Sequence, residues 1–373
     1  MLKLFQLLFI IFLFFCVKIK AETKILIFGD FGMGNDNQKI VARDMEDFCD
    51  KKGCDFAVTV GDNIYPKGVG NDNFNQPNYK IITDYFVNNY KSMNMPFYMA
   101  FGNHDIGNEK LEKEHKISDK LATLMSNQIK YTKHSDNPSV IDRNKNSLRL
   151  WYFPAPYYYI KEKDGVNLFA LDTNSFPDRI LDEDLQKTKR RYNSEQSKWL
   201  NQSLGEIKNN KNSWKLVFGH MPIISHGAHG FLEAKEIKIF RESLIKLLCS
   251  EKVDFYLSGH DHHLEVDRYT CDNGHTITSV ISGAASQTAR IFSQTFANDS
   301  NNSKLIWANG KLYDPDSTVF RNNDRVLGFA YLTIDGAQAQ LRMQLSKGAS
   351  DERQNGCFEI NKDGSFLTVK CSD

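Results

Sequence analysis

The sequence lacks several features that mark common functional classes. Its 47 lysine and arginine residues are matched by 46 aspartate and glutamate residues, so no excess of positive charge favours nucleic-acid binding. It has no glycine-rich GxxxxGK phosphate loop, and no Ser or Cys stands beside a His in a recognisable nucleophile setting. It also has no internal repeat, no coiled-coil heptad and no close CxxC pair. These absences disfavour P-loop nucleotide hydrolysis, covalent catalysis and cysteine-ligated metal sites.

Only one stretch is long and strongly apolar, and it lies at the start of the chain. Residues 4–17 are dominated by Leu, Ile and Phe, follow the basic Lys3, and precede the small residue Ala21. The run is shorter than the ~20 residues that a spanning helix needs. It therefore predicts a secretory signal peptide over residues 1–21, cleaved between Ala21 and Glu22. Ile19, which is not small, leaves an uncleaved anchor as the alternative. The predicted localisation is secreted, or lumenal or periplasmic, depending on the organism.

Six of the seven cysteines follow this segment, an even number that predicts disulfides in a secreted protein. They fall in three local couples, from which we predict the bonds Cys49–Cys54, Cys249–Cys271 and Cys357–Cys371. Asn201, Asn298 and Asn301 each begin an N-x-S sequence, which makes a glycoprotein one reading and chance in an Asn-rich chain the other.

Short apolar runs, each followed at once by a polar cluster, recur along the chain. These runs are residues 24–28, 56–60, 96–101, 215–218 and 253–257. Near-continuous apolar character is typical of strands buried on both faces. Apolar residues at helical spacing lie between them, at residues 41–48, 200–207 and 233–249. Alternating strands and helices predict an α/β fold, whose sites lie beyond the carboxyl ends of the strands. The polar clusters can therefore converge on one pocket.

Three polar stretches interrupt this alternation. Residues 109–149 predict a helical insertion with its helix around residues 117–129, and residues 176–193 and 292–325 predict exposed loops. The first of these loops holds the basic cluster of residues 187–191, which we interpret as a solvated charge run.

The strand ends carry side chains suited to metal binding. They are two carboxylates, an amide, a phenol and three imidazoles: Asp30, Asp62, Asn103, Tyr65, His220, His260 and His262. Mixed oxygen and nitrogen ligands suit a borderline or hard transition metal, and their number suits two ions bridged by one carboxylate. Singly these signals are weak, because a Gly-Asp pair is often a turn and a lone His is often structural. Their occurrence together, each at a strand end, is poorly explained by chance.

Five motifs in this order resemble the signature of the calcineurin-like metallophosphoesterases. They are residues 30–32, 61–65, 102–105, 217–220 and 259–262. More narrowly they resemble the purple acid phosphatases, because Gly32 stands where the wider superfamily has a His and Tyr65 appears in the second motif. Segments 151–157, 171–173, 282–284 and 328–331 are similar to the small, tartrate-resistant-like branch. The resemblance covers residues 24–345.

This resemblance implies a four-layer α/β metallophosphoesterase fold, a two-sheet β-sandwich flanked by helices on both sides. It implies Fe(III) held by Asp30, Tyr65 and His262, and a divalent ion (Fe, Zn or Mn) held by Asn103, His220 and His260, with Asp62 bridging. It places His104 and His229 in the pocket, where either would orient the phosphate or protonate the leaving group. By the same comparison, His226 and His263 are interpreted as surface histidines.

The domain organisation that follows is a signal peptide at 1–21, a phosphatase domain at 22–348 and an extension at 349–373, which we interpret as a hairpin closed by Cys357–Cys371. The implied activity is acid phosphatase, hydrolysing phosphate monoesters of small molecules or phosphoproteins by attack of a metal-bound hydroxide. A phosphodiesterase or nucleotidase on the same metal core is one alternative. A phosphatase-like scaffold that binds partner proteins is another, and the intact ligand set argues against it.

Overall fold

The computed structural model describes residues 22–70, 76–106, 117–175, 183–208, 210, 213–291, 302–312, 325–346 and 354–372. The predicted signal peptide and two of the predicted glycosylation sites, Asn298 and Asn301, lie outside these residues. Within them, no helix is long and apolar enough to cross a membrane.

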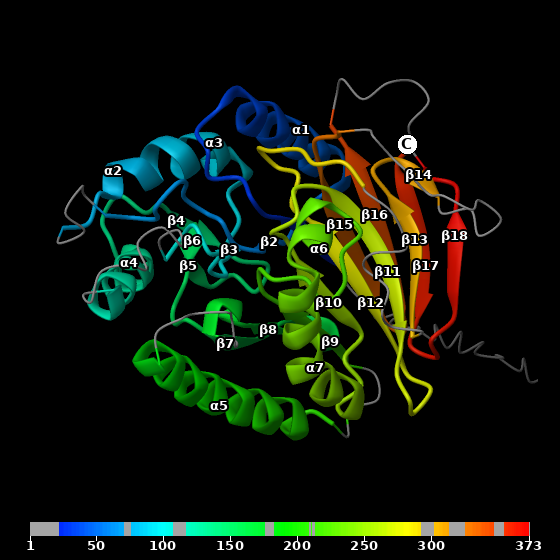
Figure 1. Cartoon of the computed structure of the whole chain (residues 1–373). Helices are drawn as coiled ribbons and strands as arrows, with labels where there is room; N and C mark the ends of the chain where they lie inside the picture. The colour runs from blue at the N-terminus through cyan, green and yellow to red at the C-terminus, as the bar shows by residue number, and fades with distance from the viewer. Residues whose placement is uncertain are drawn as a thin grey trace, which may run out of the picture.

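Two eight-stranded sheets form the centre of the molecule (Figure 1). The first sheet has the order β18 (Phe366–Val369), β17 (Gly356–Asn361), β16 (Gln338–Leu345), β15 (Gly328–Asp335), β1 (Thr23–Phe28), β2 (Phe56–Thr59), β3 (Phe97–Tyr98), β6 (Trp151–Tyr152). The second has the order β14 (Lys311–Leu312), β13 (Ser303–Ala308), β11 (Leu264–Thr270), β12 (Thr276–Ser282), β10 (Phe255–Ser258), β9 (Trp214–Phe218), β8 (Val166–Ala170), β7 (Tyr158–Lys161). A separate hairpin joins β4 (Ser139–Ile141) to β5 (Ser147–Arg149).

Helices cover the outer face of each sheet. The α-helices of the described residues are α1 (Asp36–Lys52), α2 (Tyr79–Ile82), α3 (Asn88–Tyr90), α4 (Ile117–Tyr131), α5 (Glu183–Glu206), α6 (Ala228–Leu232) and α7 (Ala234–Ser250). In Figure 1, α1 to α3 lie along the top of the view, while α5 and α7 lie below and in front of the second sheet.

Alternation along the strands explains these layers. In β9, Leu216 and Phe218 are buried in the core between the sheets, whereas Val217 packs with Leu204 of α5 and Leu244 of α7. A strand buried on both faces has apolar residues at nearly every position, as the sequence predicted. The result is the predicted four-layer order of helices, sheet, sheet and helices.

Helix α1 begins close to the end of β1 because of a side-chain cap. The Asn35 side chain accepts a hydrogen bond from the Gln38 amide at 2.9 Å, and Gly53 ends the helix at φ +79°. The short connection this produces leaves Asp30 at the carboxyl end of β1, where the site begins.

The structure corrects the predicted loops. Residues 183–193 are the first half of helix α5 rather than a loop. They include good helix formers and no Gly or Pro, and their polar character hid the helix. Strands β13 and β14 lie in the second predicted loop, and the β4–β5 hairpin lies in the predicted helical insertion. Helix α4 occupies the predicted helical middle of that insertion.

The three disulfides pair as predicted, Cys49–Cys54, Cys249–Cys271 and Cys357–Cys371. The last of them links β17 to the residues that follow β18. These two strands form an antiparallel pair, and β17 pairs with β16. The end of the chain therefore extends the first sheet at its edge.

Candidate metal centre

The loops that follow β1, β2, β3, β9 and β10 meet at one end of the sandwich. Strands β1, β2 and β3 are parallel neighbours in the first sheet, and β9 and β10 are parallel neighbours in the second. Their carboxyl ends therefore carry polar residues from both sheets to the same place. All seven predicted metal ligands lie there, as two groups of three with Asp62 between them.

The first group contains Asp30, Tyr65 and His262. The Tyr65 hydroxyl lies 3.3 Å from Asp30 Oδ1 and 3.4 Å from His262 Nε2, and His262 Nε2 lies 3.5 Å from Asp30 Oδ1. Burial and the negative charges of Asp62 and Asp30 raise the pKa of Tyr65 well above its usual value. A carboxylate and a phenol packed this closely require a cation before the phenol can ionise.

The second group contains Asn103, His220 and His260. Asn103 Oδ1 lies 3.0 Å from His220 Nε2 and 3.1 Å from His260 Nδ1, and these two imidazole nitrogens are 3.2 Å apart. His220 Nδ1 lies 2.9 Å from the Val60 carbonyl oxygen, which can only accept a hydrogen bond. This contact fixes Nδ1 as the donor and leaves Nε2 with a lone pair directed into the group.

Asp62 lies between the two groups. Its Oδ2 is 3.5 Å from His220 Nε2, and its carboxylate also interacts with the Tyr65 hydroxyl. Burial would raise the pKa of Asp62, but the electrostatic effect of the nearby His220 and His104 imidazoles and the hydrogen bond from Tyr65 hold it below its usual value. An ionised carboxylate that contacts both groups fits a bridge between two cations.

The backbone at three of these residues is held in an uncommon conformation. Asp30, Asp62 and His260 have φ values of +56°, +54° and +69°. Non-glycine residues rarely adopt this left-handed region, and they do so mostly at functional sites. The His260 amide donates to Asp30 Oδ2 at 3.0 Å, and the Asp30 amide donates to the Gly61 carbonyl at 2.9 Å. The first bond holds the ligand loops of the two sheets against each other, and the second joins the loops that follow β1 and β2 within the first sheet.

Two glycines permit this close approach. A Cβ atom at Gly102 would lie 2.1 Å from Asp62 Oδ1, and one at Gly259 would lie 2.4 Å from Asp30 Oδ2. Any side chain at either position would displace a candidate ligand. The Gly in the motifs at residues 102–105 and 259–262 is therefore required by the packing of the carboxylates.

Asp105, the last residue of the third motif, supports the ligand loops. Its carboxylate accepts hydrogen bonds from the backbone amides of Asn63, Ile64 and Gly102 at 2.7–3.1 Å. Burial and the charge of Asp62 raise its pKa to about 7. The carboxylate holds the loop of Asp62 against the loop of Asn103.

The two predicted pocket histidines border the cluster. The His104 ring lies 4.3 Å from the Tyr65 ring between centroids, and its Nδ1 is 3.1 Å from the Pro66 carbonyl. The His229 ring lies 4.5 Å from that of His260 and 5.7 Å from that of His262. Both side chains are only partly buried, so a ligand at the cluster can reach them.

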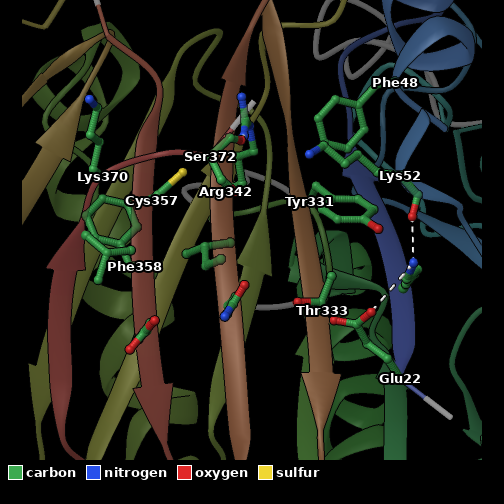
Figure 2. Close-up of a pocket in the computed structure, with 15 residues that line it drawn as sticks. Glu22, Phe48, Lys52, Tyr331, Thr333, Arg342, Cys357, Phe358, Lys370 and Ser372 are labelled. Atoms are coloured by element: carbon green, nitrogen blue, oxygen red, sulfur yellow. Dashed lines mark hydrogen bonds and ion pairs between the residues drawn. The ribbon is translucent and has the colours of Figure 1, made fainter.

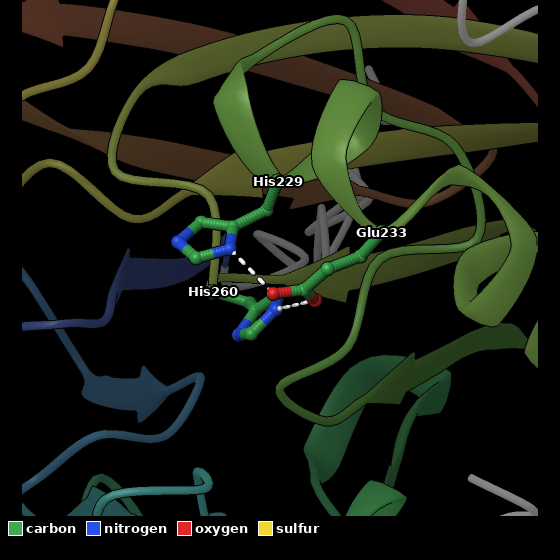
Figure 3. Close-up of side chains that lie close together, drawn as sticks. All are labelled: His229, Glu233 and His260. Carbon is green, nitrogen blue, oxygen red and sulfur yellow. Dashed lines mark hydrogen bonds and ion pairs between the residues drawn. The ribbon is translucent and has the colours of Figure 1, made fainter. Parts of the chain in front are cut away.

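Glu233 joins His229 to His260 and was missed from the sequence (Figure 3). One carboxylate oxygen lies 2.8 Å from His229 Nδ1 and the other lies 2.8 Å from His260 Nε2. Burial raises the pKa of Glu233 and lowers that of His229, but the hydrogen bond between the two side chains outweighs burial. The pKa of Glu233 is therefore below its usual value, and that of His229 is raised to about 9. The only signal in the sequence was the i, i+4 spacing from His229, which no motif drew attention to.

The surface assignment of His226 and His263 is wrong. Their exposed fractions are 1% and 0%, and each contacts the buried carboxylate of Glu265, at 3.0 Å and 2.9 Å. Burial lowers the pKa of His263, but the negative charges of Asp261 and Glu265 raise it more, to about 10. Both histidines are therefore buried partners of an acidic residue.

A groove on the first sheet lies apart from the predicted site residues (Figure 2). Its labelled lining residues include Glu22, Phe48, Tyr331 and Arg342, from or near β1, α1, β15 and β16. The Arg342 guanidinium lies 5.6 Å from the centre of the Phe48 ring. The groove contains none of the candidate metal ligands.

The sequence and fold resemble those of known phosphoesterases. The family described as calcineurin-like phosphoesterase matches residues 23–264. Purple acid phosphatase 3 of Arabidopsis thaliana is 29% identical over 66% of this chain and 60% of its own length. Tartrate-resistant acid phosphatase type 5 of Homo sapiens is 27% identical over 84% of this chain and 81% of its own. The chain thus spans less than two thirds of the first of these relatives.

Two solved structures share the fold. Purple acid phosphatase PPD1 from yellow lupin seeds has a TM-score of 0.54 at 17% identity and covers 95% of this chain and 58% of its own. GAP50, described as the anchor in the inner membrane complex of Plasmodium, has a TM-score of 0.55 at 16% identity and covers 95% and 91%. At these identities the likeness is one of fold, and it agrees with the predicted metallophosphoesterase sandwich.

Proposed function

The chain belongs to the calcineurin-like phosphoesterase family, and on that premise we propose that it is an acid phosphatase of the purple type, which hydrolyses phosphate monoesters at a binuclear metal centre. The observation that supports this most strongly is the convergence of seven ligand-type side chains, in two groups with Asp62 between them. A protein that used this fold only to bind partners would have no need to bury such a set.

The residues present fit two cations. Asp30, Tyr65 and His262 would hold Fe(III), Asn103, His220 and His260 would hold a divalent iron, zinc or manganese ion, and Asp62 would bridge them. A bound pair of cations supplies a water nucleophile at mildly acid pH and neutralises the charge of the phosphate. The chain itself supplies the rigid ligand loops, since Asp105 and the left-handed backbone residues fix them in advance.

His229 is the proposed proton donor to the leaving alkoxide. Its Nδ1 is engaged by Glu233 at 2.8 Å, so the proton it delivers is the one on Nε2. A pKa of about 9 keeps the imidazole protonated throughout the mildly acid range. His104, whose Nδ1 contacts the Pro66 carbonyl, is proposed to orient the phosphate through Nε2.

The proposed setting is an oxidising compartment. Three disulfides are typical of secreted or lumenal proteins, and they agree with a signal peptide at residues 1–21. Asn201 is exposed on α5 and would accept a glycan there. Residues 22–348 would form the phosphatase domain, and residues 349–373 an extension of its first sheet. The proposed substrates are phosphorylated small molecules or phosphoproteins.

A substrate panel combined with a visible spectrum tests this proposal. The purified chain with two bound metals should be coloured under oxidising conditions, and Tyr65→Phe should abolish the band. It should also hydrolyse monoesters at acid pH faster than diesters or nucleotides. A colourless protein with two bound metals would contradict the ferric tyrosinate, and preferred cleavage of diesters would favour the phosphodiesterase alternative. Binding of two metals without hydrolysis of any ester would favour a scaffold.

A further inference from the structure

A second group of ligand-type side chains is buried on the helix-facing side of β11, outside the candidate metal centre. Leu264 and Val266 of this strand face the core between the sheets, so the alternate residues Glu265 and Asp267 point the other way. His226, from the loop between β9 and α6, packs against both carboxylates. Exposed fractions are 1% for His226 and Asp267 and 0% for Glu265. We refer to His226, Glu265 and Asp267 as the β11 cluster.

The atoms of the β11 cluster have the spacing of metal ligands. His226 Nδ1 lies 3.0 Å from Glu265 Oε1 and 3.6 Å from Asp267 Oδ1. One ligand atom from each of the three residues lies within 4.8 Å of the other two. Around a tetrahedral ion with bonds of ~2.1 Å, neighbouring ligand atoms are ~3.4 Å apart. Small movements would therefore place all three atoms on one ion.

Asp267 is the observation that points to a bound ion. It interacts with His226 and Glu265, yet among the described residues no donor gives a hydrogen bond to either of its oxygens. Glu265 differs, because its Oε2 lies 3.1 Å from the His226 amide and 2.9 Å from His263 Nε2. Ser279 lies opposite Asp267 on β12, and its buried hydroxyl likewise makes no hydrogen bond to the described part of the chain. Burial and the charge of Glu265 raise the pKa of Asp267 well above its usual value.

We propose that His226, Glu265 and Asp267 bind one divalent cation of the zinc type, at a site separate from the binuclear centre. One imidazole and two carboxylates suit zinc or a similar transition ion, whereas Ca²⁺ and Mg²⁺ favour oxygen ligands. A buried carboxylate is stabilised by a cation in the same way as by an ion-pair partner.

The ion would fix the loop that leads to His229. That loop is already held by Asp261, whose Oδ2 accepts hydrogen bonds from Ser225 Oγ at 2.6 Å and from the Gly230 amide at 2.9 Å. His226 lies between these two anchored residues. A cation there would attach the middle of the loop to β11 and so hold the start of α6, which carries His229.

Zinc content is the first test. A chelator first removes all metal from the full chain, which is then dialysed to equilibrium against ZnCl₂ alone. Elemental mass spectrometry measures the number of zinc ions bound per chain. We expect three zinc ions per chain for the natural protein and two for Asp267→Asn. The matched control, Asp335→Asn, removes an exposed carboxylate at the end of β15 and should keep three. His226→Gln should also lose one ion, which preserves the test if Asp267→Asn fails to fold.

The thermal midpoint supplies a second readout whose sign separates the alternatives. With zinc, Asp267→Asn should unfold at a lower temperature than the natural chain; without zinc it should unfold at a higher one, because a neutral amide relieves repulsion from Glu265. Equal zinc contents in the two proteins, together with a more stable variant in both conditions, would overturn the proposal and assign a shared proton to the carboxylates. If instead the proposed binuclear centre bound no metal, the zinc content would be one ion per natural chain and none per Asp267→Asn chain. The difference of one ion would remain.

Discussion

Replacing Glu233 by Gln tests whether one carboxylate supports both the proposed metal ligand His260 and the proposed proton donor His229. The change keeps the shape of the side chain and removes its charge. Two contacts of 2.8 Å are affected, to His229 Nδ1 and to His260 Nε2. Glutamine cannot accept a hydrogen bond at both ends, so one of the two imidazoles must change its protonation or lose its partner.

The size of the effect follows from these contacts. A hydrogen bond to a charged group contributes ~1.5–3 kcal/mol, which corresponds to a factor of roughly 10–100. Carboxylates that orient metal-bound histidines have effects of about the same size on metal affinity or activity. We therefore expect Glu233→Gln to lower kcat/KM by roughly 10–100-fold, with the larger loss on alkyl phosphates, which need protonation more than nitrophenyl phosphate does.

A double-mutant cycle with His229→Ala separates the two arms of Glu233. If Glu233 acts on catalysis through His229, then Glu233→Gln should add little further loss of rate in the His229→Ala background. Its effect on metal affinity, measured by dialysis, should persist there because it acts through His260. Glu242→Gln, which changes an exposed residue on α7, the helix that follows Glu233 directly, is the control and should leave both measurements unchanged. Fully additive losses of rate, with equal effects on both ester types, would refute the link to His229.

Three further outcomes test the site and the fold. Asp62→Asn should lose both metals, since Asp62 contacts both ligand groups, and retention of two metals per chain would show that another residue bridges them. Gly102→Ala should also lose metal, because its Cβ would lie 2.1 Å from Asp62 Oδ1, whereas Gly205→Ala on α5 meets open space and should stabilise the chain by about 0.5–1 kcal/mol in thermal unfolding. Glu162 is buried, its pKa is raised, and it accepts a hydrogen bond from the Tyr98 hydroxyl at 2.7 Å. The folded state therefore binds its proton more tightly than the unfolded state, and stability is lost as the pH rises from about 4, the ordinary glutamate value, through the raised pKa. Glu162→Gln should increase the free energy of unfolding at pH 7 and not at pH 4; equal effects at both pH values would exclude titration of Glu162 as the cause.

The sequence predicted best the elements whose pattern is local. Residues 233–249 were predicted as a helix and α7 runs from Ala234 to Ser250, because a repeating apolar spacing is a property of neighbouring residues. The division of the strands between two sheets could not be predicted from spacing, since parallel strands buried on both faces look alike in either sheet. The two-sheet sandwich was predicted only because the motifs resemble those of the metallophosphoesterases.

In the candidate site, too, residues marked by a local pattern were predicted, and residues placed there by contacts distant in sequence were missed. Residues at strand ends were identified because their position follows from the strand. Glu233 was missed because its importance arises from a fold that places it beside His260. Glu265 and Asp267 alternate with apolar residues, a pattern typical of a half-exposed strand, yet the loop of His226 covers them. Which face of a strand is covered depends on segments distant in sequence. The surface assignment of His226 and His263 was based on the residues that the family has at these positions, and that comparison does not show that both histidines contact the buried Glu265.

The order of the candidate ligands along the chain has a consequence for biosynthesis. They run from Asp30, just after the first strand, to His262, after the tenth, and they come from both sheets. During synthesis on a ribosome, more than two hundred residues are added after Asp30 before His262 emerges. Contacts this distant in sequence are slow to form. Metal capture would therefore be a late event that requires completion of both sheets. A chain truncated before β10 would leave the carboxylate of Asp30 without its partner His262.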